Sequence, residues 1–183
     1  MTGGRQQLRS SRGFTLIELL AVVVIMGILA TIGLSSFLGQ MRQARTAEVR
    51  ASIKAICAAQ ERFRAENLQY FNVSTDINAY YPTVDPGLNK YTFFNQPSSN
   101  NASNWERLRP QISEPVRYAY ASVAGLPTTA YPDLGLSATV GWPATVSPWY
   151  AVKAIGDYDD DGVNSVVVAT SFSNTLLWEN ESE

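Results

Sequence analysis

The hydrophobic pattern of the chain begins with one long apolar run. From Leu19 to Leu38, twenty consecutive residues are uncharged and mostly apolar. At a rise of ~1.5 Å per residue, a helix of that length covers roughly the 30 Å hydrocarbon core of a bilayer. Arginines precede the run and a long domain follows it, so the excess of positive charge places the N-terminus in the cytoplasm and the domain outside. The pattern predicts one membrane-spanning helix.

After this run the helical pattern continues, but only one face remains apolar. Val49, Ile53, Ile56 and Phe63 recur at spacings of four, three and seven residues, which is the period of an amphipathic helix. Neither Gly nor Pro occurs between Gly39 and Gln69, so nothing marks a helix end there. We therefore expect the span and the amphipathic segment to form one long helix, whose stripe packs on a sheet.

The C-terminal part of the chain predicts that sheet. Alternating and β-branched residues indicate antiparallel strands at 116–123, 149–156 and 164–172, with a short fourth strand at 174–180. Turn formers between residues 72 and 109 predict an irregular connection whose aromatic residues either anchor it to the core or form an adhesive patch. Residues 125–148, rich in Pro and Gly, predict a long surface excursion. The expected fold class is α+β, a long N-terminal helix packed on a small antiparallel sheet.

The composition removes most enzyme classes. The chain contains no histidine and a single cysteine, Cys57, which excludes metal sites built on His or Cys, serine–histidine triads and cysteine–histidine pairs. A single cysteine cannot close a disulfide within the chain, so the head must be stabilised by packing. From Asn67 onward five basic residues face twelve acidic ones, and such an acidic head is not expected to bind nucleic acid. We do not expect an enzyme.

One acid, Glu18, stands at the beginning of the apolar region. A carboxylate inside hydrocarbon costs ~2.5–3.5 kcal/mol even on the permissive insertion scale. Glu18 therefore needs a cationic partner, or a position near the headgroups that its side chain can reach. A cleaved secretory signal would have a shorter apolar core with small residues after it, and this run is too long for one.

The residues around Glu18 resemble a known processing site. The sequence RGFTLIELL, residues 12–20, is similar to the N-terminal motif of type IV prepilins and of the related pseudopilins of type II secretion. The resemblance implies cleavage between Gly13 and Phe14 by a prepilin peptidase, with methylation of the new amino group of Phe14. It also implies that Glu18 neutralises the amino terminus of a neighbouring subunit, an arrangement in which a buried carboxylate is tolerated because an ammonium lies beside it.

The same resemblance implies the organisation and role of the whole chain. It predicts a structural subunit of a type IV pilus, a homopolymer assembled by a platform and motor proteins. The precursor would lie in the inner membrane with its head outside the cytoplasm, and the filament at the cell surface. The expected segments are a leader (1–13), a transmembrane and filament-core helix (14–40), the amphipathic half of that helix (41–70), and a head (71–183) with a variable loop region (71–115) and a sheet (116–183).

Two other interpretations remain open at this stage. A type II secretion pseudopilin is favoured by an acidic turn in the head and by the absence of the cysteine pair that closes the head of many pilins. The other alternative belongs to a different class, a single-span periplasmic binding module, whose membrane helix requires neither Gly13 nor Glu18. Replacing Gly13 distinguishes a filament protein from this binding module, because only the filament protein needs that glycine for maturation.

The acidic turn is the one candidate metal site. In GDYDDDGVNS, Asp157, Asp159 and Asp161 alternate before a glycine, as in the first half of a calcium-binding loop. The match is partial, because Val168 stands where an EF-hand has its bidentate acid. Some pseudopilins bind calcium in this part of the head, which makes calcium the candidate cofactor. The alternative is a hairpin whose Asp-Gly turn is merely solvated.

Overall fold

The computed structural model describes residues 13–96, 101–137, 140–144, 146–158 and 160–181. Its elements are the helices α1 (Leu16–Asn67) and α2 (Ala102–Leu108) and the strands β1 (Ala119–Gly125), β2 (Trp149–Gly156), β3 (Ser165–Thr170) and β4 (Ser173–Glu179). The chain divides into two compact units, residues 1–43 and 44–183, so the boundary falls within α1. The predicted α+β class is confirmed.

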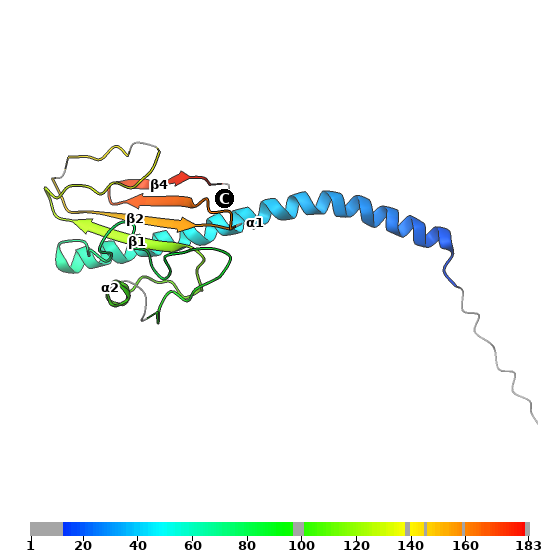
Figure 1. The fold of residues 1–183 in the computed structure, drawn as a ribbon, viewed down its shortest axis with the longest axis horizontal. Coiled ribbons are helices and arrows are strands. Elements are labelled where there is room, and N and C mark those ends of the chain that lie inside the picture. The colour runs from blue at the N-terminus through cyan, green and yellow to red at the C-terminus, as the bar shows by residue number, and fades with distance from the viewer. Residues whose placement is uncertain (1–12, 97–100, 138–139, 145, 159, 182–183) are drawn as a thin grey trace, which may run out of the picture. The chain divides into compact units, whose positions relative to one another are not determined.

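The four strands form one antiparallel sheet in the order β1-β2-β3-β4 (Figure 1). Tyr120 of β1 lies opposite Ala154 of β2, and Val152 of β2 lies opposite Ala169 of β3. Strand β2 has its predicted bounds. Strand β1 begins three residues later than predicted, because Val116 instead forms an isolated bridge with Tyr91.

The inner face of the sheet packs against the part of α1 that belongs to the head. Val49, Ile53 and Ile56 are fully buried in the same core as Tyr150 and Val152 of β2. Burying an aliphatic side chain of this size contributes ~1.5–3 kcal/mol. The apolar stripe predicted from the sequence is therefore confirmed, and it accounts for the attachment of the sheet to this part of the helix.

The described residues between positions 126 and 148 form the predicted surface excursion, since they are exposed or half-buried apart from Leu134, and it lies against the outer face of the sheet. Leu134 is 3% exposed and belongs to a second apolar cluster with Trp149 of β2. Tyr131 stacks on Trp142 with ring centroids 4.0 Å apart. The outward residues of β2 include the apolar Trp149 and Ala151 as well as Lys153, which is buried and donates to Asn78 Oδ1. The apolar part of this face packs against side chains of the Pro- and Gly-rich stretch.

The aromatic residues between positions 70 and 105 anchor the irregular connection to the core. Tyr81 and Trp105 are fully buried and Phe93 is 2% exposed. The rings of Tyr81 and Trp105 stack at 5.7 Å, and Trp105 lies in α2, one of the short helical pieces expected in this region. The anchoring interpretation therefore holds for these three residues, and the adhesive-patch interpretation does not.

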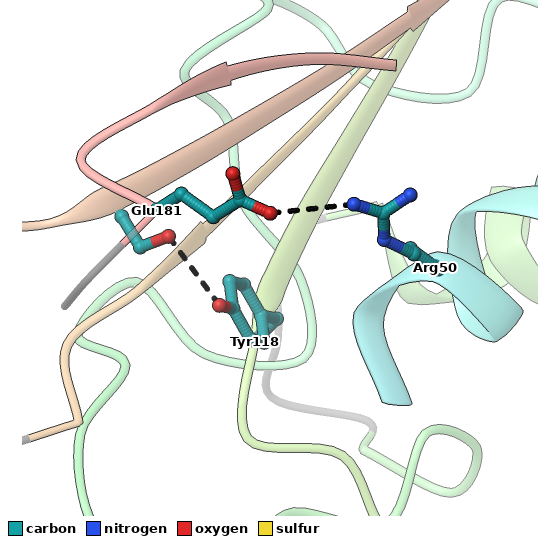
Figure 2. Close-up of polar contacts among 4 residues, drawn as sticks. Arg50, Tyr118 and Glu181 are labelled. Atoms are coloured by element: carbon teal, nitrogen blue, oxygen red, sulfur yellow. Dashed lines mark hydrogen bonds and ion pairs between the residues drawn. The ribbon is translucent and has the colours of Figure 1, made fainter. Parts of the chain in front are cut away.

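Several arginines of the head lie over aromatic rings. The guanidinium carbon of Arg45 is 4.6 Å from the ring centroid of Tyr158, and that of Arg50 is 4.9 Å from the ring of Trp178. Figure 2 shows that Arg50 also pairs with Glu181 at 3.3 Å. Both side chains of this ion pair are about half exposed, so the pair contributes only ~0–1 kcal/mol, and the cation–π contact contributes a similar ~0.5–1 kcal/mol.

The tyrosines of the head make its stability sensitive to alkaline pH. Burial raises the pKa of Tyr80 and of Tyr81 from 10.0 to about 12, and burial also raises the pKa of Tyr120, Tyr150 and Tyr158. A raised pKa in the folded state means that this stabilisation is complete below pH 10 and is lost as the pH rises through the folded pKa. We expect the head to unfold between about pH 10 and 12, as measured by tyrosine absorbance at high pH together with circular dichroism.

A Tyr81→Phe variant is the control for this prediction. It removes one titrating group and a hydroxyl that is buried with no hydrogen-bond partner among the described residues. The variant should be at least as stable as the parent at neutral pH, and its alkaline transition should begin at a higher pH. Tyrosine ionisation that is complete near pH 10 without loss of ellipticity would contradict the expected coupling.

Candidate functional site

The site begins with three residues that precede the long helix. Gly13, Phe14 and Thr15 lie before α1, and Phe14 is 82% exposed. A side chain placed on Gly13 would meet no atom within 4 Å. The fold of the described residues therefore does not require glycine at this position, and the reason for it lies outside the folded chain. Residues 1–12, the rest of the predicted leader, are outside the described residues.

Glu18 and Thr15 form a capping box at the start of α1. The backbone N–H of Thr15 donates to Glu18 Oε2 at 2.9 Å, and the hydroxyl of Thr15 donates to the same oxygen at 2.7 Å. In return the backbone N–H of Glu18 donates to Thr15 Oγ1 at 3.3 Å. The arrangement satisfies helix N–H groups that have no partner in the preceding turn, and it places a negative charge at the positive end of the helix.

Sequence reasoning missed Thr15 as a site residue, although its signal was visible. Thr15 and Glu18 are three residues apart and stand directly before an apolar run, which is the pattern of a capping box. The carboxylate thus has donors in its own chain as well as any partner in a second chain. Both donors use one oxygen, Oε2.

The apolar part of α1 buries none of its described side chains in this chain. A segment of 19 residues, Leu16–Leu34, is long and apolar enough to cross a membrane, and none of it is buried. Leu16, Ile25 and Ile32 are 85%, 57% and 65% exposed. The hydroxyl of Thr31 donates to the carbonyl of Gly27 at 3.0 Å, so this polar group is satisfied within the helix, as lipid requires.

Gly27 and Gly33 of this segment also have no packing role in the single chain. A β-carbon at either glycine would meet no atom within 4 Å. Each glycine lowers helix propensity by ~1 kcal/mol relative to alanine, yet α1 is helical through both. Small residues on an apolar helix allow another helix to approach closely. The packing of the single chain therefore gives no reason for either glycine.

The acidic turn of the head uses its carboxylates to hold its own backbone. Asp157 is 7% exposed and accepts hydrogen bonds from the N–H groups of Asp160 at 2.7 Å and Gly162 at 2.9 Å. Asp161 accepts from the N–H of Val163 at 2.7 Å. Asp159 lies outside the described residues. Within the described ranges, no group of three or more His, Cys, Asp or Glu side chains could hold a metal, and the calcium site stays a prediction.

Two guanidinium groups lie next to this turn. Arg45 and Arg117 are 4.6 and 5.9 Å from the ring centroid of Tyr158, which follows Asp157 in the sequence. The hydroxyl of Tyr158 is buried, and burial is the first cause of its raised pKa. Both arginines therefore contact the turn through the ring of Tyr158.

Comparison with known proteins identifies at the N-terminus the same motif that the sequence predicted. Residues 8–34 match the model of the prokaryotic N-terminal methylation motif. The chain is 37% identical over 82 residues to the type II secretion system core protein G of Pseudomonas aeruginosa, which covers 44% of this chain and 58% of that protein. It is 39% identical over 67 residues to the type IV major pilin protein PilA of Myxococcus xanthus, covering 37% of this chain and 30% of that protein.

The N-terminal part of this chain is therefore similar to type IV pilins and to type II secretion pseudopilins. A third relative, the core protein G of Klebsiella michiganensis, is 33% identical over 85 residues, which cover 45% of this chain and 60% of the relative. The pilin-like chain thus spans about a third to three fifths of the length of these relatives. No solved structure matches it. The pilin and pseudopilin family is structural and not enzymatic.

The matched motif contains all three residues that the sequence predicted for processing and assembly. Gly13, Phe14 and Glu18 fall within residues 8–34. The structure places Phe14 in the exposed segment before the helix and Glu18 in its first turn. The pilin-like chain therefore presents the predicted cleavage position on an accessible segment, four residues before the acid.

Proposed function

We propose that this chain is the structural subunit of a type IV pilus, which polymerises through the N-terminal half of α1 after a prepilin peptidase removes residues 1–13. The observation that supports this most directly is the apolar segment Leu16–Leu34, which follows a methylation motif and buries nothing in its own chain. In the precursor this surface contacts lipid. In the filament it contacts the same segment of other subunits.

Glu18 determines the register of that contact in the proposed mechanism. Cleavage before Phe14 creates a new amino group only four residues from Glu18. Within one chain, Glu18 Oε2 is bound by Thr15. In the bundle its carboxylate receives the ammonium of Phe14 from a neighbouring subunit, because a carboxylate deep in an apolar bundle is tolerated only with a cation beside it. An assembly platform and motor proteins of the inner membrane extract the subunit.

A type II secretion pseudopilin is the second candidate. The relatives from Pseudomonas and Klebsiella carry that name and align over 82 and 85 residues, against 67 for the pilin. The two roles differ in where the filament ends. Labelling of intact cells with antibody against the head detects a surface pilus. Loss of protein secretion on deletion, without surface filaments, identifies a pseudopilin.

A Gly13→Val variant is expected to block maturation. Gly13 has no neighbours that a side chain would displace, so the head and the helix should form normally. The peptidase must bind the extended chain around the cleaved bond, where glycine lets the backbone approach closely. Intact-mass spectrometry of membrane fractions should show a parent chain that starts at methylated Phe14 and a variant that retains its leader.

Gly33→Ala is the matched control for this variant. Gly33 also lacks neighbours within 4 Å, but it lies far from the cleaved bond, so this variant should be processed like the parent. A Gly13→Val chain that begins at Phe14 would contradict the proposed processing. A parent that keeps residues 1–13 would favour a membrane-anchored binding module instead.

A further inference from the structure

We propose that the side chain of Leu68 docks into a hollow on the head of a neighbouring copy of this chain, lined by residues 48–52 of α1 and residues 111–116. This inference rests on the proposed function, because it assigns a head-to-head contact within the filament. Both surfaces lie in the head unit, residues 44–183.

Leu68 combines a disfavoured backbone conformation with a largely exposed apolar side chain. It follows the last residue of α1 with φ of 61°, and its N–H donates to the carbonyl of Arg64 at 2.8 Å. Glycine or asparagine is usual at such a helix end, because a β-carbon is disfavoured in the left-handed conformation. Leu68 is also 85% exposed. Residues that break local rules without a gain in their own chain are expected at functional sites.

The hollow that we assign to this side chain lies elsewhere on the head. Its volume is about 370 Å³. Its apolar lining includes Ile112 and Val116, which are 8% and 2% exposed, together with Ala51 and Pro115. Two other hollows of similar volume are lined by more polar groups, among them Asn67 and Arg107 in one and Glu106 and Arg109 in the other. The isobutyl side chain of Leu68 can therefore make apolar contacts in the hollow lined by Ile112 and Val116.

In the proposed contact, the side chain that fills the hollow comes from a second copy of this chain. Ser52, in the lining of the hollow, and Leu68 are 16 residues apart, which corresponds to ~24 Å along a helix if the helical rise is kept. Each subunit therefore carries Leu68 at one position on the head and the hollow at a different position. Such a contact is not self-complementary, so it repeats in one direction and generates an open filament.

Charge also favours this pairing. Arg107 lines the hollow formed partly by Asn67 and Gln69, the two residues that flank Leu68. Glu114 is exposed and lines the receiving hollow together with Glu48. Glu48 already pairs with Lys90 at 3.4 Å. In the proposed contact, Glu114 of one copy therefore pairs with Arg107 of the copy that inserts Leu68. Opposite charges at the edge of a contact help to fix its register.

A Leu68→Gly variant separates docking from folding. Glycine adopts the left-handed conformation without steric cost. The thermal midpoint of the full-length protein in detergent should therefore stay unchanged or rise. The yield of sheared filaments should fall about tenfold, which corresponds to ~1.4 kcal/mol of lost contact energy per subunit. Val146→Gly is the control, because Val146 is 83% exposed but far in sequence from both surfaces. Parental filament yield in Leu68→Gly overturns the proposal.

Cross-linking tests the contact itself. In a Cys57→Ala background, which removes the native thiol, Leu68→Cys is combined with Ser113→Cys. Mild oxidation of filaments should then give a ladder of dimers and higher multimers that neither single variant gives. Filaments without a ladder overturn the docking and leave the proposed function intact. If the parent, processed at Phe14, forms no filaments, the proposed function fails and the docking fails with it.

Charge reversal provides a second, independent readout. Arg107→Glu and Glu114→Arg should each lower the filament yield, and the double variant should recover it, because the pair is restored with opposite polarity. Equal yields in all four proteins overturn the assigned pairing of these two residues.

Discussion

Replacing Glu18 with leucine is expected to abolish filament assembly while α1 remains helical and inserted in the membrane. Removing an acid from an apolar segment lowers the cost of insertion by ~2.5–3.5 kcal/mol, so the precursor should accumulate and be cleaved normally. In the bundle, however, the ammonium of each Phe14 would lose its carboxylate. An uncompensated buried charge costs ~3–5 kcal/mol, which corresponds to a loss of at least about a hundredfold in subunit association.

Two further variants separate the charge of Glu18 from its capping role. Glu18→Gln retains an oxygen that can accept the N–H of Thr15, a bond of 2.9 Å in the parent, but it carries no charge. Thr15→Val retains the backbone donor and removes the hydroxyl that donates at 2.7 Å. We expect Glu18→Gln to fail in assembly like Glu18→Leu. Thr15→Val should assemble, because loss of the two capping bonds of the Thr15 hydroxyl costs only ~1–2 kcal/mol.

The measurement compares sheared filaments with the membrane pool of mature subunit. For Glu18→Leu and Glu18→Gln, we expect mature subunit in the membrane fraction and none in the sheared filaments. In both variants cleavage should leave Phe14 as the first residue. Efficient polymerisation of Glu18→Leu would show that the acid does not determine assembly. Assembly by Glu18→Gln alone would assign the role of Glu18 to the capping box and not to a second chain.

The elements with a strong local pattern were predictable from the sequence. The apolar stripe Val49, Ile53 and Ile56 is buried as its period required. Strand β2, Trp149–Gly156, has the predicted bounds, because Pro148 and the turn after Gly156 limit an apolar run on both sides. The N-terminal motif was also recognisable from the sequence, since a glycine, an aromatic residue and an acid at fixed spacing fall within the matched residues 8–34.

The elements that depend on tertiary contacts were not predictable in the same way. Residues 125–148 contain the turn formers typical of a surface loop, but the burial of Leu134 could not be predicted from them, because it depends on contact with an apolar cluster that includes Trp149 and Ala151 of the sheet. The start of β1 was placed at Val116, which pairs instead with Tyr91, a residue 25 positions earlier in a region without a regular pattern. A strand end that is determined by a distant partner leaves no local signal.

Gln60 is the second position where a large effect is expected. Its side chain is fully buried. Its Nε2 donates to the carbonyl of Phe71 at 2.8 Å and to Ser122 Oγ at 2.9 Å. Its Oε1 accepts the N–H of Phe71 at 2.9 Å. One amide thus joins α1 to the chain that leaves it and to β1. Its spacing from Ile53 and Ile56 placed it on the apolar face, a signal that sequence reasoning did not use.

Gln60→Leu is expected to destabilise the head by ~2–4 kcal/mol, because leucine fills similar space but leaves the N–H and carbonyl of Phe71 and the hydroxyl of Ser122 without their partner. The thermal midpoint of the full-length protein in detergent should fall by roughly 5–15 °C. Gln43→Leu is the control, since Gln43 lies on the same helix but is exposed, and its midpoint should stay close to that of the parent.

Gln60→Glu identifies which of these bonds matters most. A carboxylate can still accept the N–H of Phe71, but it cannot donate to the carbonyl of Phe71 or to Ser122, and it brings a charge into the core. Burial would raise the pKa of this new acid, so its protonated form, which can donate, would be favoured in the folded state. The variant should therefore be most stable below the unfolded pKa of about 4.3 and lose stability as the pH rises toward neutrality. Equal stability at pH 4 and pH 7, relative to the parent at each pH, would show that the amide of Gln60 is not the joint between helix and sheet, and that apolar packing alone holds α1 to the head.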